Sequence, residues 1–500
     1  MTNEMIFTYQ TRLVLDDKQD EILQQYANLL NKVERSLYAE VAKGKTSASC
    51  KNDFLKKFEV TARQFNGCRV SLEGKIEACK AAQNRAIESL KEQIAQLILK
   101  IKLLEKKTSK HFVLHQKKRR LTNLQQLLTS TEKDRQEKRV RLCFGSKKLF
   151  KGQFNLKNKG FKSYLEWKEA WKASRNNEFF LLGSKDESSG NQTCTAKLQS
   201  DGKLCLRLRL PKNLEGIHGK YIEIPNITFS YGHQAIIAAL NYPEGQAISY
   251  RFKKDAKGWR VFASTVTRKV DCVSQEGLGV IGIDLNTDHI ACVETDRFGN
   301  LIGTTIFPWT TYGKKKNQLK AITGDVCKKI IDMAKAKNKP IVIENLDFQK
   351  KKLSLKDNKN KKFSRCLSSF AYGLFFGCLI GRAFKEGIEV CRVNPAFTSI
   401  IGRINYAKRY GLSIHLAAAF CIARRYQKFS ESPCSPKGNI PNGKGGHVAF
   451  VLPVRNRTKH VWHFWAQVKK KFTTVLAAHF QAMNRSLSPL NPTLVTADSS

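Results

Sequence analysis

The sequence predicts a multidomain fold, in which a β-barrel carries an inserted α-helical domain and is followed by an α/β domain. Three observations predict it. Apolar residues recur every three or four positions from Ile87 to Leu104, as in a helix, and every second position from Leu204 to Leu210, as in a strand. After residue 277, three strand-like segments precede alternating helices and strands. A chain of 500 residues has room for several domains, each with its own core.

The first barrel strand is expected within residues 1–20, where the chain reads "MIFTYQTRLVL", and the helical domain within residues 21–148. In the helical domain, a polar break near Thr108 separates the first periodic segment from a second one, "KKRRLTNLQQLLTSTEKDRQEKR". This pattern is typical of an antiparallel coiled-coil hairpin with solvated charged faces. The basic excess of the hairpin leaves nucleic-acid binding open as a second role.

The rest of the barrel is expected within residues 149–276. The segments "GKLCLRLRLP" and "YIEIPNITF" have the composition of strands, and "AISYRFKKDAKGWRVFASTV" has the pattern of a hairpin that turns at "DAKG". Together with the N-terminal strand, these segments can close a small barrel. Arg207, Arg209 and Lys253 are expected on its outward faces, where cations suit contacts to backbone phosphates.

The α/β domain is expected within residues 277–430, in the order strand, strand, strand, helix, strand, helix, strand, helix. Three strands that can pair antiparallel, followed by α/β crossovers, are the order of a ribonuclease-H-like fold. Residues 431–500 form a basic C-terminal segment that contains "KHVWHFW".

Two carboxylates end strands that should be neighbours in this fold. Asp284 closes "GVIGIDLN" and Glu344 closes "IVIEN", and in an open α/β sheet ligands bind at the carboxyl ends of the strands. Adjacent carboxylates repel each other unless a divalent cation or a proton neutralises them, and their oxygens suit Mg²⁺ or Mn²⁺. Each segment alone also fits an ordinary buried strand with a polar end. Asp288, Glu294 and Asp347 are interpreted as surface or turn residues.

Charge and cysteine content narrow the partners and the compartment. Lys and Arg number 88 against 42 Asp and Glu, and the formal net charge of +46 is spread along the chain, which favours a polyanionic partner. No apolar run approaches the length of a membrane span and the start does not resemble a signal peptide, so we expect a cytoplasmic protein of the bacterial cytosol or nucleoid, without membrane binding. The 14 cysteines include no C-x-x-C pair, which argues against a zinc ribbon.

Several of these segments together resemble a known family. "GIDLN", "IVIENL" and "VNPAFTS", with weaker support from "GWRVFAS" and "LCFGSKKLF", are similar to segments of the transposon-encoded TnpB proteins and the related small type V CRISPR effectors. These are RNA-guided DNA nucleases with a RuvC-type nuclease domain. The resemblance covers essentially the whole chain. It implies a wedge-like barrel, a helical recognition domain, a guide RNA and target DNA as partners, and Asp284 and Glu344 as the first two catalytic, metal-binding acids.

Two departures from the family pattern bear on metals. Members commonly carry a four-cysteine zinc ribbon after the "NPAFTS"-type segment, whereas "TSIIGRINYAKRYG" contains no cysteine, so no structural zinc is expected. The third acid of the family opens a helix, and here "HLAAAFCIARR" places His415 at that position. A neutral imidazole can bind a metal or relay a proton, but it adds no negative charge. His415 is therefore a candidate catalytic and metal-binding residue, or a helix-start histidine without a ligand role.

Three functions follow from this reading. The first is an RNA-guided DNA endonuclease that hydrolyses phosphodiesters with Mg²⁺ or Mn²⁺ on a target selected by base pairing and a short flanking DNA motif. The second is an RNA-guided DNA-binding protein that cleaves double strands weakly or not at all, because His415 replaces the third acid. The third is an unguided ribonuclease-H-like nuclease or transposase.

Further nucleic-acid contacts are expected beside the strand ends and in the C-terminal segment. The lysine runs around residues 314–320 and 350–362 can line a DNA channel or be solvated loops, and the tryptophans near residue 462 can stack on bases or belong to a core. The candidate residues are Lys314, Lys315, Lys351, Lys352, Arg424, Arg425 and Trp462.

Overall fold

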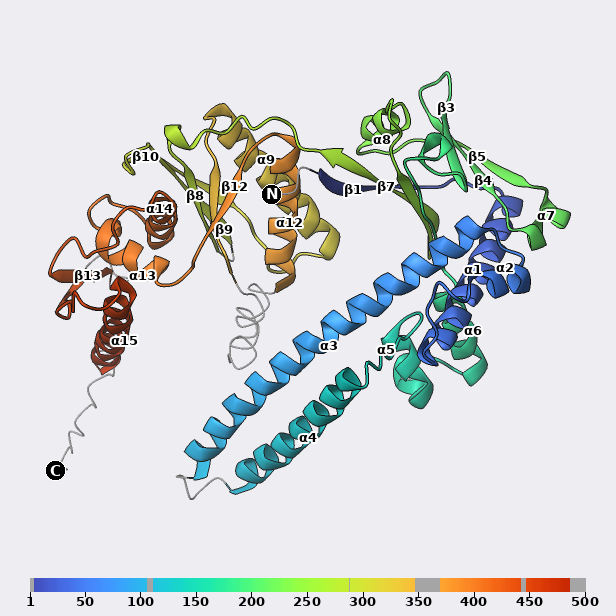
Figure 1. Cartoon of the computed structure of the whole chain (residues 1–500). Coiled ribbons are helices and arrows are strands. Elements are labelled where there is room, and N and C mark those ends of the chain that lie inside the picture. Colours follow the sequence, from blue (N-terminus) through green and yellow to red (C-terminus); the bar gives the residue numbers. More distant parts are fainter. Residues whose placement is uncertain (1–3, 106–110, 287, 347–368, 442–446, 486–500) are drawn as a thin grey trace, which may run out of the picture. The chain divides into compact units, whose positions relative to one another are not determined.

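The computed structural model describes residues 4–105, 111–286, 288–346, 369–441 and 447–485 (Figure 1). The chain divides into two compact units, Met1–Arg268 and Lys269–Ser500. The predicted contacts Lys351 and Lys352 lie outside the described residues. No helix of the described residues is both long enough and apolar enough to cross a membrane.

Unit 1 contains two antiparallel sheets. Its strands are β1 (Glu4–Arg12), β2 (Glu178–Leu181), β3 (Cys194–Leu198), β4 (Leu204–Arg209), β5 (Tyr221–Ile227), β6 (Ile248–Asp255) and β7 (Gly258–Arg268). The first sheet has the order β1-β7-β6-β2 and the second the order β3-β4-β5. The predicted hairpin at "DAKG" is confirmed, because Asp255 pairs with Gly258 across a two-residue turn. The strands are thus joined into two sheets, and closure into one barrel is not confirmed.

The alternation seen in the sequence sets the faces of the second sheet. Leu204, Leu206 and Leu208 of β4 are fully buried, because every second residue of a strand points to the same face. Arg207 and Arg209 therefore lie on the opposite face. One hydrophobic cluster joins the buried residues of both sheets to helices α1 and α3.

The helices of unit 1 follow β1 in the chain. Those described are α1 (Asp17–Ala42), α2 (Lys51–Phe58), α3 (Ala62–Glu105), α4 (His111–Gln136), α5 (Lys147–Phe150), α6 (Tyr164–Arg175), α7 (Lys212–His218) and α8 (His233–Leu240). Helix α1 begins with a capping box, in which Asp16 and Gln19 each accept a hydrogen bond from the other's backbone N–H. Helices α3 and α4 lie side by side as a long hairpin (Figure 1), with Ile87, Leu90 and Leu97 of α3 buried.

Unit 2 is built on one mixed sheet of five strands in the order β10-β9-β8-β11-β12. The strands are β8 (Ile281–Leu285), β9 (His289–Thr295), β10 (Leu301–Pro308), β11 (Ile341–Glu344) and β12 (Val390–Val393). The first three pair antiparallel, and β11 pairs parallel with both β8 and β12. In chain order this is 3-2-1-4-5, so the predicted ribonuclease-H-like strand order is confirmed.

Helices cover both faces of this sheet (Figure 1). Helices α9 (Lys316–Ala336) and α12 (Ser369–Lys385) share a hydrophobic cluster with Ile281 and Ile283 of β8. On the other face, α14 packs on β8 and β9, and its cluster extends to α13 and α15. The remaining elements are α13 (Thr398–Gly402), the π-turn Arg403–Ala407, α14 (Ile414–Tyr426), β13 (Lys437–Pro441), β14 (His447–Val451) and α15 (Val461–Arg485).

An ion-pair cluster in unit 2 joins β9 to the segment that follows α9. The Glu294 carboxylate lies 2.7 Å from the ammonium groups of both Lys337 and Lys339, and its side chain is only 12% exposed. Lys339 also donates to the carbonyl of Thr295 at 2.8 Å. Burial by itself raises the pKa of Glu294, but the hydrogen bonds from the two lysines outweigh it and lower the pKa below its ordinary value. Of the two sequence-based interpretations of Glu294, the turn is wrong, because the residue lies within β9, where it is half-buried.

We expect Glu294→Gln to lower the free energy of unfolding by about 3 kcal/mol at neutral pH, because it leaves the Lys339 ammonium buried without an anion. A depressed folded pKa means that this stabilisation is complete above the unfolded pKa of Glu294 and is lost as the pH falls through the folded pKa. Urea unfolding at several pH values measures both effects. The control is Glu386→Gln, which removes an exposed ion pair with Lys335 and should cost less than about 1 kcal/mol. Equal losses in the two variants at pH 7 would contradict the prediction.

Candidate active site

The strand register of unit 2 brings the two predicted acids level. In the parallel pair β8–β11, Ile281 lies opposite Ile341 and Gly282 opposite Val342. Carried two residues further, the same register places Asp284 beside Glu344, at the carboxyl ends of both strands. Asp284 is 9% exposed, so its carboxylate sits largely inside the fold.

The third predicted residue lies directly on Asp284. Successive residues of β8 point to opposite faces of the sheet, so Asp284 points to the same face as Gly282. Helix α14 packs on this face. Helix α14 begins at Ile414 after the N-cap Ser413, whose hydroxyl accepts from the N–H of Leu416 at 3.3 Å. This start places Nδ1 of His415 3.2 Å from Oδ2 of Asp284. The His415 side chain is 44% exposed and therefore reachable from solvent.

The sequence analysis missed a polar cluster formed by residues that directly follow β8. The Asn286 amide donates to the same Oδ2 of Asp284 at 3.0 Å and lies 3.5 Å from Nε2 of His289. The His289 and His415 rings meet edge to face at 4.9 Å, and Nδ1 of His289 lies 2.8 Å from the Asp288 carboxylate. Asp288 is exposed, as the sequence predicted, and it also orients a second imidazole beside the site. The available signal was "NTDH", which directly follows β8.

The Glu344 carboxylate is positioned by a residue of the "VNPAFTS" segment. The hydroxyl of Thr398, which is 2% exposed, donates to Oε1 of Glu344 at 2.5 Å. Thr398 begins α13, and the preceding Phe397 has φ 63°, a backbone conformation that is costly for a bulky residue. The strained backbone at Phe397 thus accompanies the hydrogen bond that holds Thr398 against Glu344.

A cavity of about 620 Å³ opens beside Glu344. The Arg403 guanidinium lies over the Phe472 ring at 4.9 Å, and both residues line the cavity together with Phe397 and the exposed Lys469. Burial lowers the pKa of Arg403. Among the described residues no carboxylate forms an ion pair with Arg403 or Lys469. The cavity therefore presents two cations and two aromatic rings next to a catalytic candidate.

The donor set at the strand ends suits a hard divalent cation. Two carboxylates level on adjacent strands offer the oxygen ligands that Mg²⁺ and Mn²⁺ prefer. Oδ2 of Asp284 and Nδ1 of His415 lie 3.2 Å apart, so both residues would offer donor atoms to the same cation. The three donors do not form a preassembled cluster. In the described parts of the chain, one group of three or more His, Cys, Asp or Glu residues has donor atoms that all lie within 4.8 Å of each other. It consists of Glu276, Glu389 and Cys391, near the amino ends of β8 and β12.

The other candidate contacts of unit 2 differ in accessibility. Lys314 and Lys315 are exposed just before α9. Arg424 donates to the Tyr406 hydroxyl at 3.1 Å and to the carbonyl of Gly299.

Arg425 and Trp462 share one acidic partner. The Arg425 side chain is 9% exposed and binds Glu431. The indole N–H of Trp462 donates to Glu431 at 3.0 Å, and the Arg425 guanidinium lies 5.5 Å from its ring centre. These internal contacts occupy Nε of Arg425 and the indole N–H of Trp462, whereas the second terminal nitrogen of Arg425 is buried without a hydrogen-bond partner in the protein.

In unit 1, two of the three predicted contacts, Arg207 and Lys253, are also engaged within the protein. Arg207 stacks on Tyr221 with its guanidinium carbon 3.9 Å from the ring centre. The Nε of Arg209 is buried without a hydrogen-bond partner in the protein. Lys253 is exposed and forms an ion pair with Glu178 at 2.8 Å.

Comparison with known proteins gives distant structural similarity. No protein-family model matches the chain, and no curated protein matches it. A solved complex of Cas12f1 with sgRNA and target DNA is 13% identical, with a TM-score of 0.36, over 84% of this chain and 99% of that chain. RuvC of T. thermophilus in complex with a Holliday junction substrate is 17% identical, with a TM-score of 0.21, over 29% of this chain and 88% of that chain.

Proposed function

We propose that the chain is an RNA-guided DNA endonuclease whose RuvC-like site hydrolyses phosphodiesters with Mg²⁺ or Mn²⁺. The observation that carries the proposal is the level placement of Asp284 and Glu344 on adjacent parallel strands of a 3-2-1-4-5 sheet, with His415 on Asp284. The net charge of +46 supports a nucleic-acid substrate. Guidance by RNA, the short flanking DNA motif and the kinship with TnpB rest on the sequence resemblance.

Within this proposal the chain's own residues have distinct tasks. Asp284 and Glu344 hold the cation, which when bound stabilises the charge that develops on the phosphodiester in hydrolysis. Thr398 fixes the Glu344 carboxylate, and Asn286 fixes that of Asp284. His415 completes the donor set from α14. The cations of the cavity beside Glu344, Arg403 and Lys469, attract the phosphates on either side of the bond to be cut.

The domain assignment belongs to the same proposal. We assign a first barrel strand within residues 1–20, a helical recognition domain to 21–148, a β-barrel wedge domain to 149–276, the nuclease domain to 277–430 and a basic aromatic segment to 431–500. The pairing of β1 with β7 supports a helical domain inserted into one sheet-based domain.

A second candidate function is favoured by one contact. The His415 imidazole is hydrogen-bonded to Oδ2 of Asp284, an oxygen that would otherwise be available to a metal ion. Unlike the acid of the family pattern, His415 adds no negative charge to the site. On this reading the chain binds matched DNA through its guide and cuts it weakly or not at all.

The test begins with the RNA. The full chain is expressed together with the DNA that flanks its gene, purified, and its bound RNA is sequenced. We expect one RNA of defined length, and with its pairing segment rewritten we expect Mg²⁺-dependent cutting of a plasmid that carries the matching sequence beside a randomised flank. A folded protein that carries no discrete RNA would refute guidance. Equal cutting of unmatched plasmid would indicate an unguided nuclease, and matched binding without cutting in either Mg²⁺ or Mn²⁺ would favour the second candidate.

A further inference from the structure

A second cavity, of about 490 Å³, is lined entirely by residues of unit 1. Its volume is within the range of about 300–1,000 Å³ in which proteins bind small ligands. Lys75 of α3, Lys253 of β6, Arg175 at the end of α6 and Phe144 line it. Cations from three separate elements therefore converge on one space.

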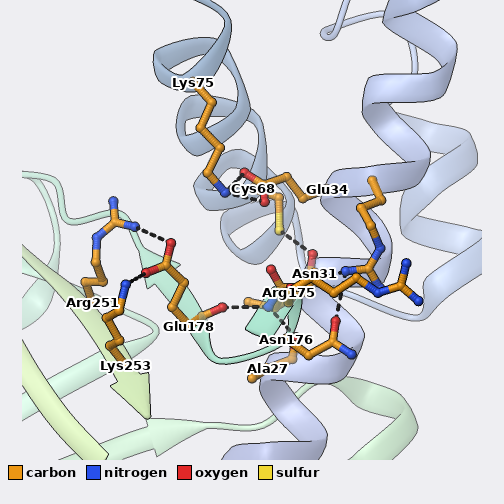
Figure 2. A network of polar contacts seen from close by, with 12 residues as sticks. Ala27, Asn31, Glu34, Cys68, Lys75, Arg175, Asn176, Glu178, Arg251 and Lys253 are labelled. Atoms are coloured by element: carbon orange, nitrogen blue, oxygen red, sulfur yellow. Dashed lines mark hydrogen bonds and ion pairs between the residues drawn. The ribbon is translucent and has the colours of Figure 1, made fainter. Parts of the chain in front are cut away.

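The cations around this cavity outnumber their anionic partners. Figure 2 shows the network: Glu34 accepts from Lys75 at 2.7 and 2.8 Å, and Glu178 is shared by Lys253 at 2.8 Å and Arg251 at 3.6 Å. These two carboxylates are matched to three cations. One positive charge is already in excess before two further arginines are counted, Arg175 of the cavity lining and Arg35 beside it.

Those arginines increase the excess. Arg35 donates to the Asn176 amide oxygen at 2.8 Å, and its pKa is lowered first by burial and then by the nearby charge of Arg175. Neither guanidinium forms an ion pair with a carboxylate in the described part of the chain. The Nε of Arg175 is buried and has no hydrogen-bond partner in the protein. A buried donor without an acceptor is costly, and an anion in the cavity would relieve both the orphaned donor and the repulsion.

The wall that carries Phe144 is held in place. The Tyr38 hydroxyl donates to the carbonyl of Val140 at 2.5 Å and accepts from the N–H of Leu142 at 3.3 Å, and the Phe144 ring meets the Tyr38 ring edge to face at 5.6 Å. Gly145 has φ 89°, and a Cβ there would come within 3.2 Å of Trp171. The wall therefore needs glycine to take this course, and the cavity is a built feature of the fold.

We propose that this cavity binds one nucleotide of a single-stranded nucleic acid, with Arg175 and Lys253 facing its phosphate and Phe144 facing its base. An aromatic face with convergent cations is the chemistry that single strands select, because bases stack on rings and phosphates bind guanidinium and ammonium groups. The inference concerns unit 1 alone and rests on the proposed function, in which it specifies one place where a nucleic-acid strand is held.

The test measures binding in the full chain that carries Asp284→Ala, so that the probe is not cut. Fluorescein-labelled single-stranded RNA and DNA 12-mers are titrated and followed by anisotropy. We expect Arg175→Gln to weaken binding of one or both probes at least about tenfold, and Lys172→Gln, which removes an equal charge from the exposed side of the same helix, to change it less than about twofold. If Arg175→Gln weakens binding of one probe more than the other, that probe shows whether the cavity receives RNA or DNA.

A second measurement uses the unaltered cavity and so does not depend on the folding of the variant. Probes with one 5-iodouracil are crosslinked by light, and the attached peptide is mapped. Attachment at Phe144 supports the proposal. Equal effects of the two substitutions, attachment confined to other residues, or occupancy by inorganic phosphate without any effect on strand binding would each overturn it. Absence of DNA cutting by the wild-type chain, with this binding intact, would count against the nuclease proposal alone.

Discussion

Asp284→Ala is expected to reduce metal-dependent DNA cleavage at least about 10³-fold, because a central metal ligand contributes several kcal/mol to the transition state and each 1.36 kcal/mol is a factor of about ten. The carboxylate lies level with Glu344 and carries the hydrogen bonds of Asn286 and His415. Cleavage of a matched duplex in Mg²⁺ and in Mn²⁺ measures the loss. Asp325→Ala is the control, since it removes one carboxylate from the exposed surface of α9. Undiminished cutting by Asp284→Ala would place the active site elsewhere.

His415→Asp extends this comparison to the departure from the family pattern. The substitution puts a third carboxylate at the position of the imidazole, whose Nδ1 now lies 3.2 Å from Oδ2 of Asp284. Because the acids repel each other, the folding of unit 2 should then depend on Mg²⁺. We expect a lower Tm without Mg²⁺, recovery when it is added, and faster Mg²⁺-dependent cutting than in the wild type. His463→Asp adds the same charge at an exposed position and should show none of these effects. Cutting by His415→Asp alone would favour a DNA-binding role for the natural chain.

Gly282→Ala is expected to destabilise unit 2 by about 3 kcal/mol, at the upper end for an overpacked core. A Cβ at Gly282 would lie 2.3 Å from the carbonyl oxygen of Ala419 and 2.9 Å from Cβ of Ala423, both in α14. Because the obstacle includes helix backbone, α14 would have to move off the sheet and carry His415 away from Asp284. The loss should therefore appear in stability and in cleavage together.

Gly324→Ala supplies a control of opposite sign. Gly324 lies within α9, and nothing lies within 4 Å of a Cβ built there, so alanine should stabilise the helix by about 0.5–1 kcal/mol. Urea unfolding followed by circular dichroism measures both variants. A Gly282→Ala chain that unfolds at the same urea concentration as Gly324→Ala would show that α14 does not press on β8 as described.

The sequence predicted the architecture around the acids because local patterns determine it. Continuous apolar runs in β8 and β11 give two buried strands that each carry a carboxylate near their carboxyl end, and the order of elements leaves few ways to arrange them in a sheet. The placement of Asp284 beside Glu344 followed from those two facts.

Contacts between distant residues could not be predicted in this way. Thr398 reaches Glu344 from 54 positions away, and no periodicity links a threonine in a loop to a strand end. The residue type alone also does not show whether a side chain has a partner inside the protein. Arg425 and Trp462 are residue types that suit a DNA-binding surface, but both are bound to Glu431. The strands of unit 1 were recognised one by one, but alternation does not specify which strand pairs with which.

The pairing of β1 with β7 has a consequence during synthesis on the ribosome. Thr8 and its partner Ser264 are separated by 256 positions, so at about 5–20 residues per second β1 waits on the order of ten seconds or more for the strand that pairs with it. The α3–α4 hairpin, made of local contacts, forms within that interval. Until translation passes Arg268, β1 therefore has no partner strand and Tyr9, which is buried in the folded chain, stays uncovered. In this window chaperones or neighbouring nascent chains can bind the strand.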